Sequence, residues 1–174
     1  MADLERVRRW AEALIALHLD PSWSFGFDHA KTRAGVLSIG QSAARKDCAG
    51  ALASPLLTLW ELASSSGMGA GVVTTARGTH ATPGATFTHS AERNWENDAE
   101  LSAEVRAQGC IDIARQLVDT PFGRGFDVLM GGGRRNFMPA TQRDPEEDDK
   151  VGARLDGRDL VAEWTRRHGG GVYA

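Results

Sequence analysis

The sequence predicts an α/β fold in which helices cover both faces of a parallel sheet. Two short apolar runs, at residues 69–75 and 126–130, end in hydroxyl-rich or glycine-rich turns, as buried strands do. Helical patterns lie before, between and after them, and strands that alternate with helices form parallel sheets. Because ligands of such sheets collect at the carboxyl ends of the strands, we expect a site just beyond residue 75.

Length and composition indicate an ordinary globular protein. The chain has 174 residues, 41 % of them hydrophobic and 25 % charged, and a net charge of −3, which gives no reason to expect a nucleic-acid or membrane partner. It holds no run of eighteen apolar residues, and three of its first six residues are charged where a secretory signal needs an apolar segment. As written, the chain is expected to stay in the cytoplasm.

The remaining elements follow from local patterns. Apolar residues recur on one helical stripe between residues 3 and 19, and Trp23, Phe25 and Phe27 then alternate with small or polar residues, as in a half-buried strand. A further strand is expected to start at 172–173. Three more helices are predicted, at 55–62, 101–118 and 157–167.

Residues 74–95 form the most informative stretch. Thr82 and Pro83 predict a helix from Pro83 to about Ala91, with a hydroxyl N-cap and a proline at its first position. The start of such a helix suits an anion, His80 and Thr82 can face one site, and Arg93 can supply a bidentate fork. The alternative is a purely structural role, in which a capped helix and a hydrogen-bonded loop histidine account for the whole pattern.

A family resemblance favours the functional interpretation. The segment GVVTTARGTHATPGATFTHSAERNW, residues 71–95, closely resembles the alkaline phosphatase family, and so do GCIDIARQL, FDVLMGGGRRNF and RLDGRDLVAEW, in the family's order. The resemblance covers about residues 31–174. It implies a partial three-layer αβα sheet and metal-dependent hydrolysis of phosphate monoesters with Mg²⁺ and Zn²⁺. It also implies phosphate monoesters or inorganic phosphate as ligands, homodimers, and a periplasmic, secreted or membrane-anchored location.

The resemblance also implies roles for single residues. The family's histidine beside the metal cluster falls on His80, its magnesium-binding hydroxyl on Thr82, and its phosphate-binding arginine on Arg93. We therefore expect His80 and Arg93 to be catalytic. Mammalian members pair two cysteines at positions that resemble Cys48 and Cys110, which implies a disulfide in an oxidising compartment. Two inert buried thiols are the alternative.

Other parts of the family's machinery are absent from this sequence. Its serine nucleophile, in a DSA-type motif, and an early metal-bridging aspartate have no match, and Ser42 lies beyond the nucleophile's place in the order of motifs. The family's remaining zinc ligands lie after the point where this chain ends. We therefore expect an incomplete, inactive fragment whose exposed sheet edges promote self-association. A non-catalytic anion-binding or structural module is the alternative.

The amino terminus has a different resemblance. Residues 1–35, which include LERVRRWAEALIALHLDPSWSFGFDHAKTRAG, resemble the start of small SprT-like metalloproteases, so residues 1–30 are predicted to be a helix-strand segment of different origin from 31–174. The HExxH zinc motif of that family does not occur in the sequence, which weighs against a zinc peptidase. The two resemblances meet at residues 31–35, as in a chimera.

Overall fold

A computed structural model describes residues 35–122, 125–145, 147 and 149–169 of the chain. The helix predicted at 3–19, the strand at 23–27 and the strand start at 172–173 lie outside these residues, as does the whole segment 1–30.

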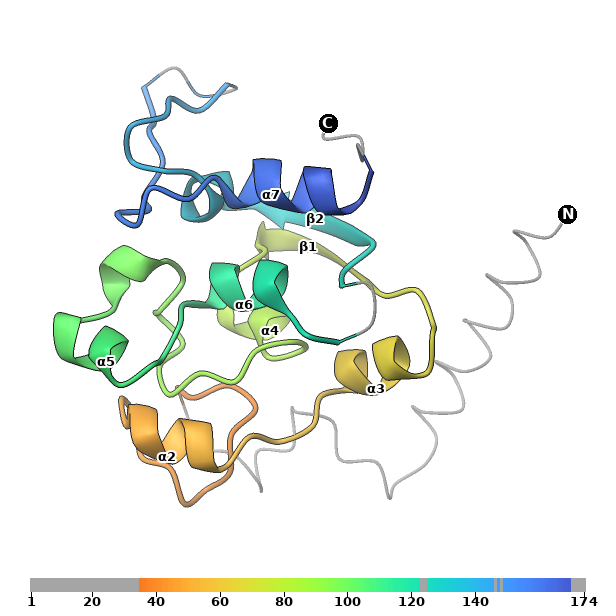
Figure 1. The fold of residues 1–174 in the computed structure, drawn as a ribbon, viewed down its shortest axis with the longest axis vertical. Coiled ribbons are helices and arrows are strands. Elements are labelled where there is room, and N and C mark those ends of the chain that lie inside the picture. The colour runs from red at the N-terminus through yellow and green to blue at the C-terminus, as the bar shows by residue number, and fades with distance from the viewer. Residues whose placement is uncertain (1–34, 123–124, 146, 148, 170–174) are drawn as a thin grey trace, which may run out of the picture.

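Two parallel strands form the sheet of the described part (Figure 1). β1 is Gly71–Arg77 and β2 is Val128–Gly132, with Val72 opposite Leu129 in the register. The prediction of an α/β fold with a parallel sheet is confirmed, and both strands begin two residues later than predicted. The close approach of the strands requires glycine, because a Cβ on Gly131 would lie 2.8 Å from the Thr74 side chain.

Short helices surround the strands. In most of them a Ser, Thr or Asp side chain accepts a hydrogen bond from a backbone N–H of the first turn, as N-caps do. No helix in the described ranges is both long and apolar enough to cross a membrane. The described helices are α2 Cys48–Ala53, α3 Leu59–Ser65, α4 Ala81–Gly84, α5 Ala103–Ala107, α6 Ile113–Asp119 and α7 Leu160–Arg167, with the 3-10 helices η1 Asp98–Glu100 and η2 Arg134–Phe137.

The single helix predicted at 101–118 is wrong, because the structure divides it into α5 and α6. Gly109 has a φ of 93°, a left-handed conformation that ends α5, and the Asp112 side chain then caps a new helix by accepting from the Arg115 N–H. The helices predicted at 55–62 and 157–167 correspond to α3 and α7, each beginning a few residues later.

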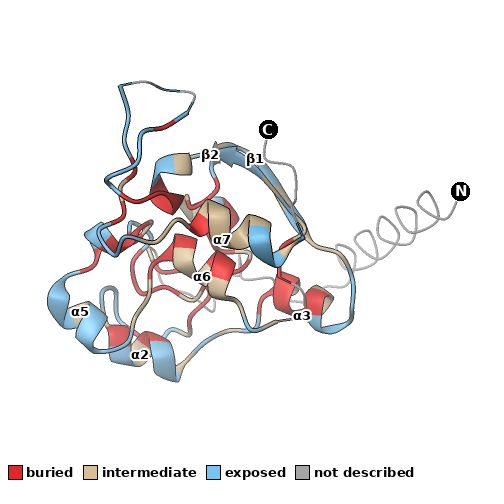
Figure 2. Cartoon of the chain, turned by 45° about the horizontal axis from the view of Figure 1, so that its top comes forward, coloured by how far each residue is buried: buried red, intermediate tan, exposed pale blue. Residues whose placement is uncertain are grey.

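The sheet has one covered face and one exposed face. Val72 and Leu129 point to the core, which α3, α6 and α7 complete, and Trp60 stacks on Phe126 there with ring centroids 4.4 Å apart. On the other face, Val73 is 76 % exposed. Figure 2 shows this exposed surface along both strands. The described residues therefore form two layers rather than the expected three, and both strands are half exposed rather than buried.

A disulfide fixes a second, smaller core. Cys48 of α2 is bonded to Cys110, 62 residues later in the chain. A link that closes a loop of this length stabilises a fold by about 4 kcal/mol, chiefly by restricting the unfolded chain. The buried residues of this core are Val36, Ile39, Ala43, Ala51, Ala91, Trp95 and Leu101.

One buried guanidinium connects several of these segments. The Arg154 side chain is 0 % exposed and donates to both carboxylate oxygens of Asp112, at 2.9 and 3.1 Å. It also donates to Asp156 at 3.0 and 2.5 Å and to the Asn136 carbonyl at 3.3 Å. Burial lowers the pKa of Arg154, but these acidic partners outweigh it and raise the pKa above the ordinary value, so the side chain stays charged.

A histidine–carboxylate pair holds the loop after α4 against α3. The His89 Nδ1 lies 2.8 Å from the Ser38 carbonyl oxygen and its Nε2 lies 2.8 Å from a Glu61 carboxylate oxygen, so the protonated ring can donate to both. Burial lowers the pKa of His89, but these two partners outweigh it and raise the pKa above 6.5. Burial raises the pKa of Glu61, but hydrogen bonds from His89 and Thr58 hold it below 4.5.

Replacing Arg154 should strongly destabilise the fold. Arg154→Met leaves Asp112 buried without its cationic partner, and breaking a buried ion pair in this way costs about 3–5 kcal/mol. Urea unfolding followed by circular dichroism measures the loss. The exposed Arg166 of α7 provides the control, because Arg166→Met should change stability by no more than about 0.5 kcal/mol. Equal stabilities of the two variants would contradict the role given to Arg154.

The His89–Glu61 pair should make stability fall above pH 6.5. Folding raises the pKa of His89. Its contribution to the free energy of unfolding is therefore complete below pH 6.5, the pKa of the unfolded chain, and is lost as the pH rises through the pKa of the folded state. The contribution of Glu61, whose pKa is lowered, is complete above 4.5 and is lost only in more acid solution. Urea unfolding should show that the free energy of unfolding decreases between about pH 5.5 and about pH 8.5, and that the decrease is smaller in His89→Gln than in the wild type. An equal decrease in the wild type and in His89→Gln would show that the His89–Glu61 pair does not cause it.

Candidate functional site

The turn that follows β1 carries the predicted site residues. The chain leaves the strand at Arg77, turns with a hydrogen bond from the His80 N–H to the Arg77 carbonyl, and enters α4. His80 is the N-cap, and Thr82 is an exposed residue inside this four-residue helix. The prediction of a helix capped by Thr82 and extending to about Ala91 is therefore wrong. The helix ends at Gly84, and one turn of helix supplies little of the dipole expected there.

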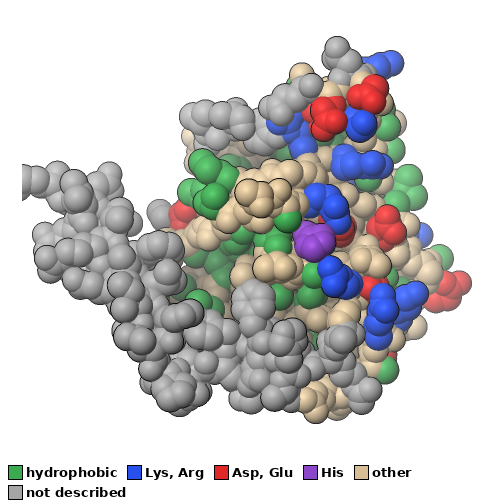
Figure 3. Space-filling view, turned by 180° about the vertical axis from the view of Figure 1, so that it is seen from behind, with side chains coloured by type: hydrophobic (Ala, Val, Ile, Leu, Met, Phe, Trp, Pro, Cys, Tyr) green, Lys and Arg blue, Asp and Glu red, His purple; other side chains and the backbone are tan. Residues whose placement is uncertain are grey.

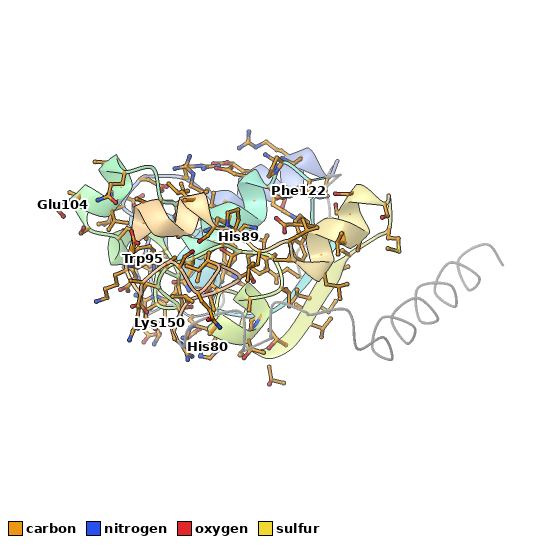
Figure 4. The ribbon with its side chains drawn as sticks, turned by 90° about the horizontal axis from the view of Figure 1, so that it is seen from below. His80, His89, Trp95, Glu104, Phe122 and Lys150 are labelled. Atoms are coloured by element: carbon orange, nitrogen blue, oxygen red, sulfur yellow. A yellow bond between two sulfur atoms is a disulfide. The ribbon has the colours of Figure 1, made fainter. Side chains whose placement is uncertain are left out.

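His80 and Arg93 lie together at the surface. The Arg93 Nη2 is 3.5 Å from the His80 Nε2, and the Arg93 backbone N–H donates to the Gly35 carbonyl at 2.8 Å. In the view of Figure 4, His80 lies near the edge of the molecule, whereas His89 lies over its middle. Figure 3 shows a face on which Lys and Arg side chains gather around a histidine. Such a surface attracts anions.

Two glutamates flank Arg93 in the sequence, and each is bound by another arginine. Arg45 donates to both oxygens of Glu92, at 2.7 and 2.9 Å. Arg77 donates to both oxygens of Glu96, with the shortest distance 2.6 Å. Within the part of the chain that the structure describes, the Arg93 guanidinium has no carboxylate partner. Its positive charge is therefore available to an external anion.

Electrostatics keep the two glutamates ionised. Burial raises the pKa of both carboxyl groups, but hydrogen bonds from Arg45 to Glu92 and from Arg77 to Glu96 outweigh it and hold each pKa below 4.5. Each carboxylate is thus compensated by its own arginine at neutral pH.

A buried polar network joins the end of β1 to the segment after Arg93. The Thr79 hydroxyl donates to Glu96 Oε2 at 2.6 Å and accepts from Asn136 Nδ2 at 2.8 Å. The Asn136 amide also donates to Glu96 at 3.1 Å, and Asn97 donates to Asn136 Oδ1 at 2.9 Å. Sequence reasoning missed these residues. The available signal, for Thr79 and Asn136, was their place shortly after the carboxyl ends of β1 and β2.

An open cleft of about 670 Å³ lies against this network. It is lined mainly by polar side chains, which suits a hydrophilic molecule. The lining residues are Arg77, Asn94, Glu96, Asn97, Ala99, Glu100, Arg135, Asn136, Gly152 and Ala153.

The described residues do not form a complete metal site. In the described ranges no three His, Cys, Asp or Glu side chains are grouped so that they can hold a metal ion. The hydroxyl of Thr82 is a suitable oxygen for Mg²⁺, but it is exposed and belongs to no such group. The residues present therefore do not fit Mg²⁺ or Zn²⁺ without further ligands, and the role of Thr82 stays a prediction.

Comparisons with known proteins identify relatives of the chain. A family model described as alkaline phosphatase matches residues 29–173. The membrane-bound alkaline phosphatase of Bombyx mori is 41 % identical over 137 residues, which are 77 % of this chain and 24 % of that protein. The tissue-nonspecific isozymes of alkaline phosphatase from Homo sapiens and Gallus gallus are 39 % and 38 % identical over the same share of the chain and 26 % of their own lengths.

These matches bear out the resemblance stated for about 31–174, while the resemblance of residues 1–35 to SprT-like metalloproteases stays a prediction. The chain spans about a quarter of the length of the relatives it matches. Since the family model covers most of the sequence, the chain belongs to the alkaline phosphatase family.

Proposed function

We propose that the protein binds the phosphate group of a phosphate monoester, or inorganic phosphate, at Arg93, as a part of metal-dependent phosphate monoester hydrolysis. The observation that carries this proposal is the pairing of charges around Arg93. Arg45 and Arg77 each bind a neighbouring glutamate, whereas Arg93 contacts the ring of His80. An unpaired guanidinium at the surface is the group that phosphate binds best.

The arrangement determines what the chain's own residues do. Arg93 presents two parallel N–H donors to the phosphate oxygens, and His80 Nε2, 3.5 Å away, lies within reach of the same group. Because Glu92 and Glu96 are both compensated, no uncompensated carboxylate among the described neighbours of Arg93 repels the anion. Family membership supports phosphate rather than another anion as the ligand.

A non-catalytic anion-binding module is the second candidate. It is favoured by the same pairing pattern, because binding through Arg93 and His80 requires no residue beyond the described ones. The two candidates differ in turnover and agree on the binding site. A zinc peptidase is disfavoured, since the sequence contains no HExxH motif.

Arg93→Ala should abolish phosphate binding. A surface arginine with one neighbouring histidine is expected to bind inorganic phosphate with a dissociation constant on the order of 1 mM at low salt, since screening weakens such contacts. Backbone amide shifts in an NMR titration at low ionic strength report the site. Arg166→Ala, which removes an exposed arginine of α7, should bind as the wild type does. Shifts of equal size in Arg93→Ala would place the site elsewhere.

The 174-residue chain on its own should hydrolyse p-nitrophenyl phosphate no faster than a protein blank. The covalent route of the family needs an activated serine, and in the described part of the chain the polar contacts of the Arg93 guanidinium and backbone N–H are to His80 and Gly35, neither of which is a serine. The assay uses alkaline buffer with Zn²⁺ and Mg²⁺, with Arg93→Ala and Ser42→Ala as controls. Saturable turnover that both a chelator and Arg93→Ala abolish would favour the hydrolase over the non-catalytic module for this chain.

A further inference from the structure

The Thr79 hydroxyl occupies a central position beside the candidate site. Its side chain is 0 % exposed, and its residue directly precedes His80. The hydroxyl donates its one hydrogen to Glu96 and accepts a hydrogen bond from Asn136. Glu96 in turn lies three residues after Arg93. One short side chain thus joins the turn that carries His80 to the segment that carries Arg93.

We propose that Thr79 is a positioning residue that fixes the His80 ring relative to the Arg93 guanidinium and thereby sets the affinity for phosphate. The part that concerns phosphate rests on the function proposed above. The part that concerns the arrangement of His80 and Arg93 can be tested without any ligand.

Of the two side chains from the end of β1 that bind the Glu96 carboxylate, Thr79 and Arg77, the geometry favours Thr79 as the one that fixes position. Arg77 also binds Glu96, but its long side chain is 49 % exposed and has many rotamers, so it fixes position poorly. Thr79 has one stiff side-chain torsion and is buried, so its 2.6 Å bond to Glu96 restricts the turn closely.

The backbone on either side of this bond is already held. The Gly78 N–H donates to the Gly132 carbonyl at 3.0 Å, and the Arg93 N–H donates to Gly35. Asn136 bonds Thr79 and Glu96 together from the end of β2. The Thr79–Glu96 bond therefore connects two segments that are each held by contacts of their own, so we expect its loss to loosen their relative position while each segment stays folded.

The test compares Thr79→Val, which replaces the hydroxyl with a methyl group and changes no charge, with Thr79→Ser, which keeps the hydroxyl. Because neither variant adds or removes a formal charge, a change in phosphate affinity that accompanies a change in the arrangement of His80 and Arg93 reports position. Thr165→Val is the matched control, since among the described residues the Thr165 hydroxyl is bonded to the Val161 carbonyl of its own helix α7 and to no group near Arg93. Amide spectra and thermal unfolding show that each full-length variant is folded.

The first readout is the nuclear Overhauser effect between the His80 ring and the Arg93 side chain, without phosphate. We expect less than half of the wild-type intensity in Thr79→Val, and wild-type intensity in Thr79→Ser and Thr165→Val. The second readout is the dissociation constant of inorganic phosphate, which should rise about tenfold in Thr79→Val alone. A hydroxyl that only stabilises the fold would lower the melting temperature and leave the Overhauser effect unchanged.

An unchanged Overhauser effect in folded Thr79→Val overturns the positioning role, whatever the phosphate titration shows. Absence of phosphate binding to the wild type overturns the proposed function and leaves the Overhauser effect to decide the role of Thr79. If Thr79→Val does not fold, Glu96→Gln weakens the acceptor of the same hydrogen bond. An unchanged effect in that variant likewise overturns the positioning role.

Discussion

The buried guanidinium of Arg154 is the interaction on which much of the described structure depends. It binds Asp112, which is also the N-cap of α6, so one carboxylate both starts the helix and pairs with the charge. Arg154 also donates to the carbonyl of Asn136, whose side chain reaches Thr79 and Glu96. The same buried guanidinium thus holds α6 and the polar network at the ends of the strands. Leaving such a buried charge without its partner is costly.

Paired charges also shape the surface around Arg93. Glu92 and Glu96 are held by backbone and side-chain hydrogen bonds, and each would repel an anion if it stood alone. Arg45 and Arg77 cancel these charges, so the sum of the five side chains, with Arg93 included, is positive. The acidic residues therefore serve as fixed acceptors that orient the segment, and the positive charge left over is that of Arg93.

The sequence predicted those elements whose formation depends on neighbouring residues. The apolar runs predicted β1 and β2, and the helical pattern at 157–167 predicted α7. The break between α5 and α6 depends on the backbone of Gly109, which composition and periodicity do not reveal. His80 and Arg93 were singled out by their spacing in residues 74–95, and the family motifs then implied their roles. Thr79 and Asn136 were missed, because their contact joins residues 57 positions apart and becomes visible only when the parallel strands bring their ends together.

The exposed face of the sheet and the candidate site are structurally independent. Val73 and Met130 lie on the open face, whereas the contacts that hold the site run between the ends of the strands and the following loops. The Gly78 N–H is bonded to the Gly132 carbonyl across the two strands, and the Thr79 hydroxyl is bonded to Glu96 and Asn136, so contacts at the ends of the strands anchor the turn before His80. A chain that spans about a quarter of the length of its relatives can therefore hold His80 and Arg93 together through hydrogen bonds of its own. It does so although, in the described residues, helices cover one face of the sheet and leave the other exposed.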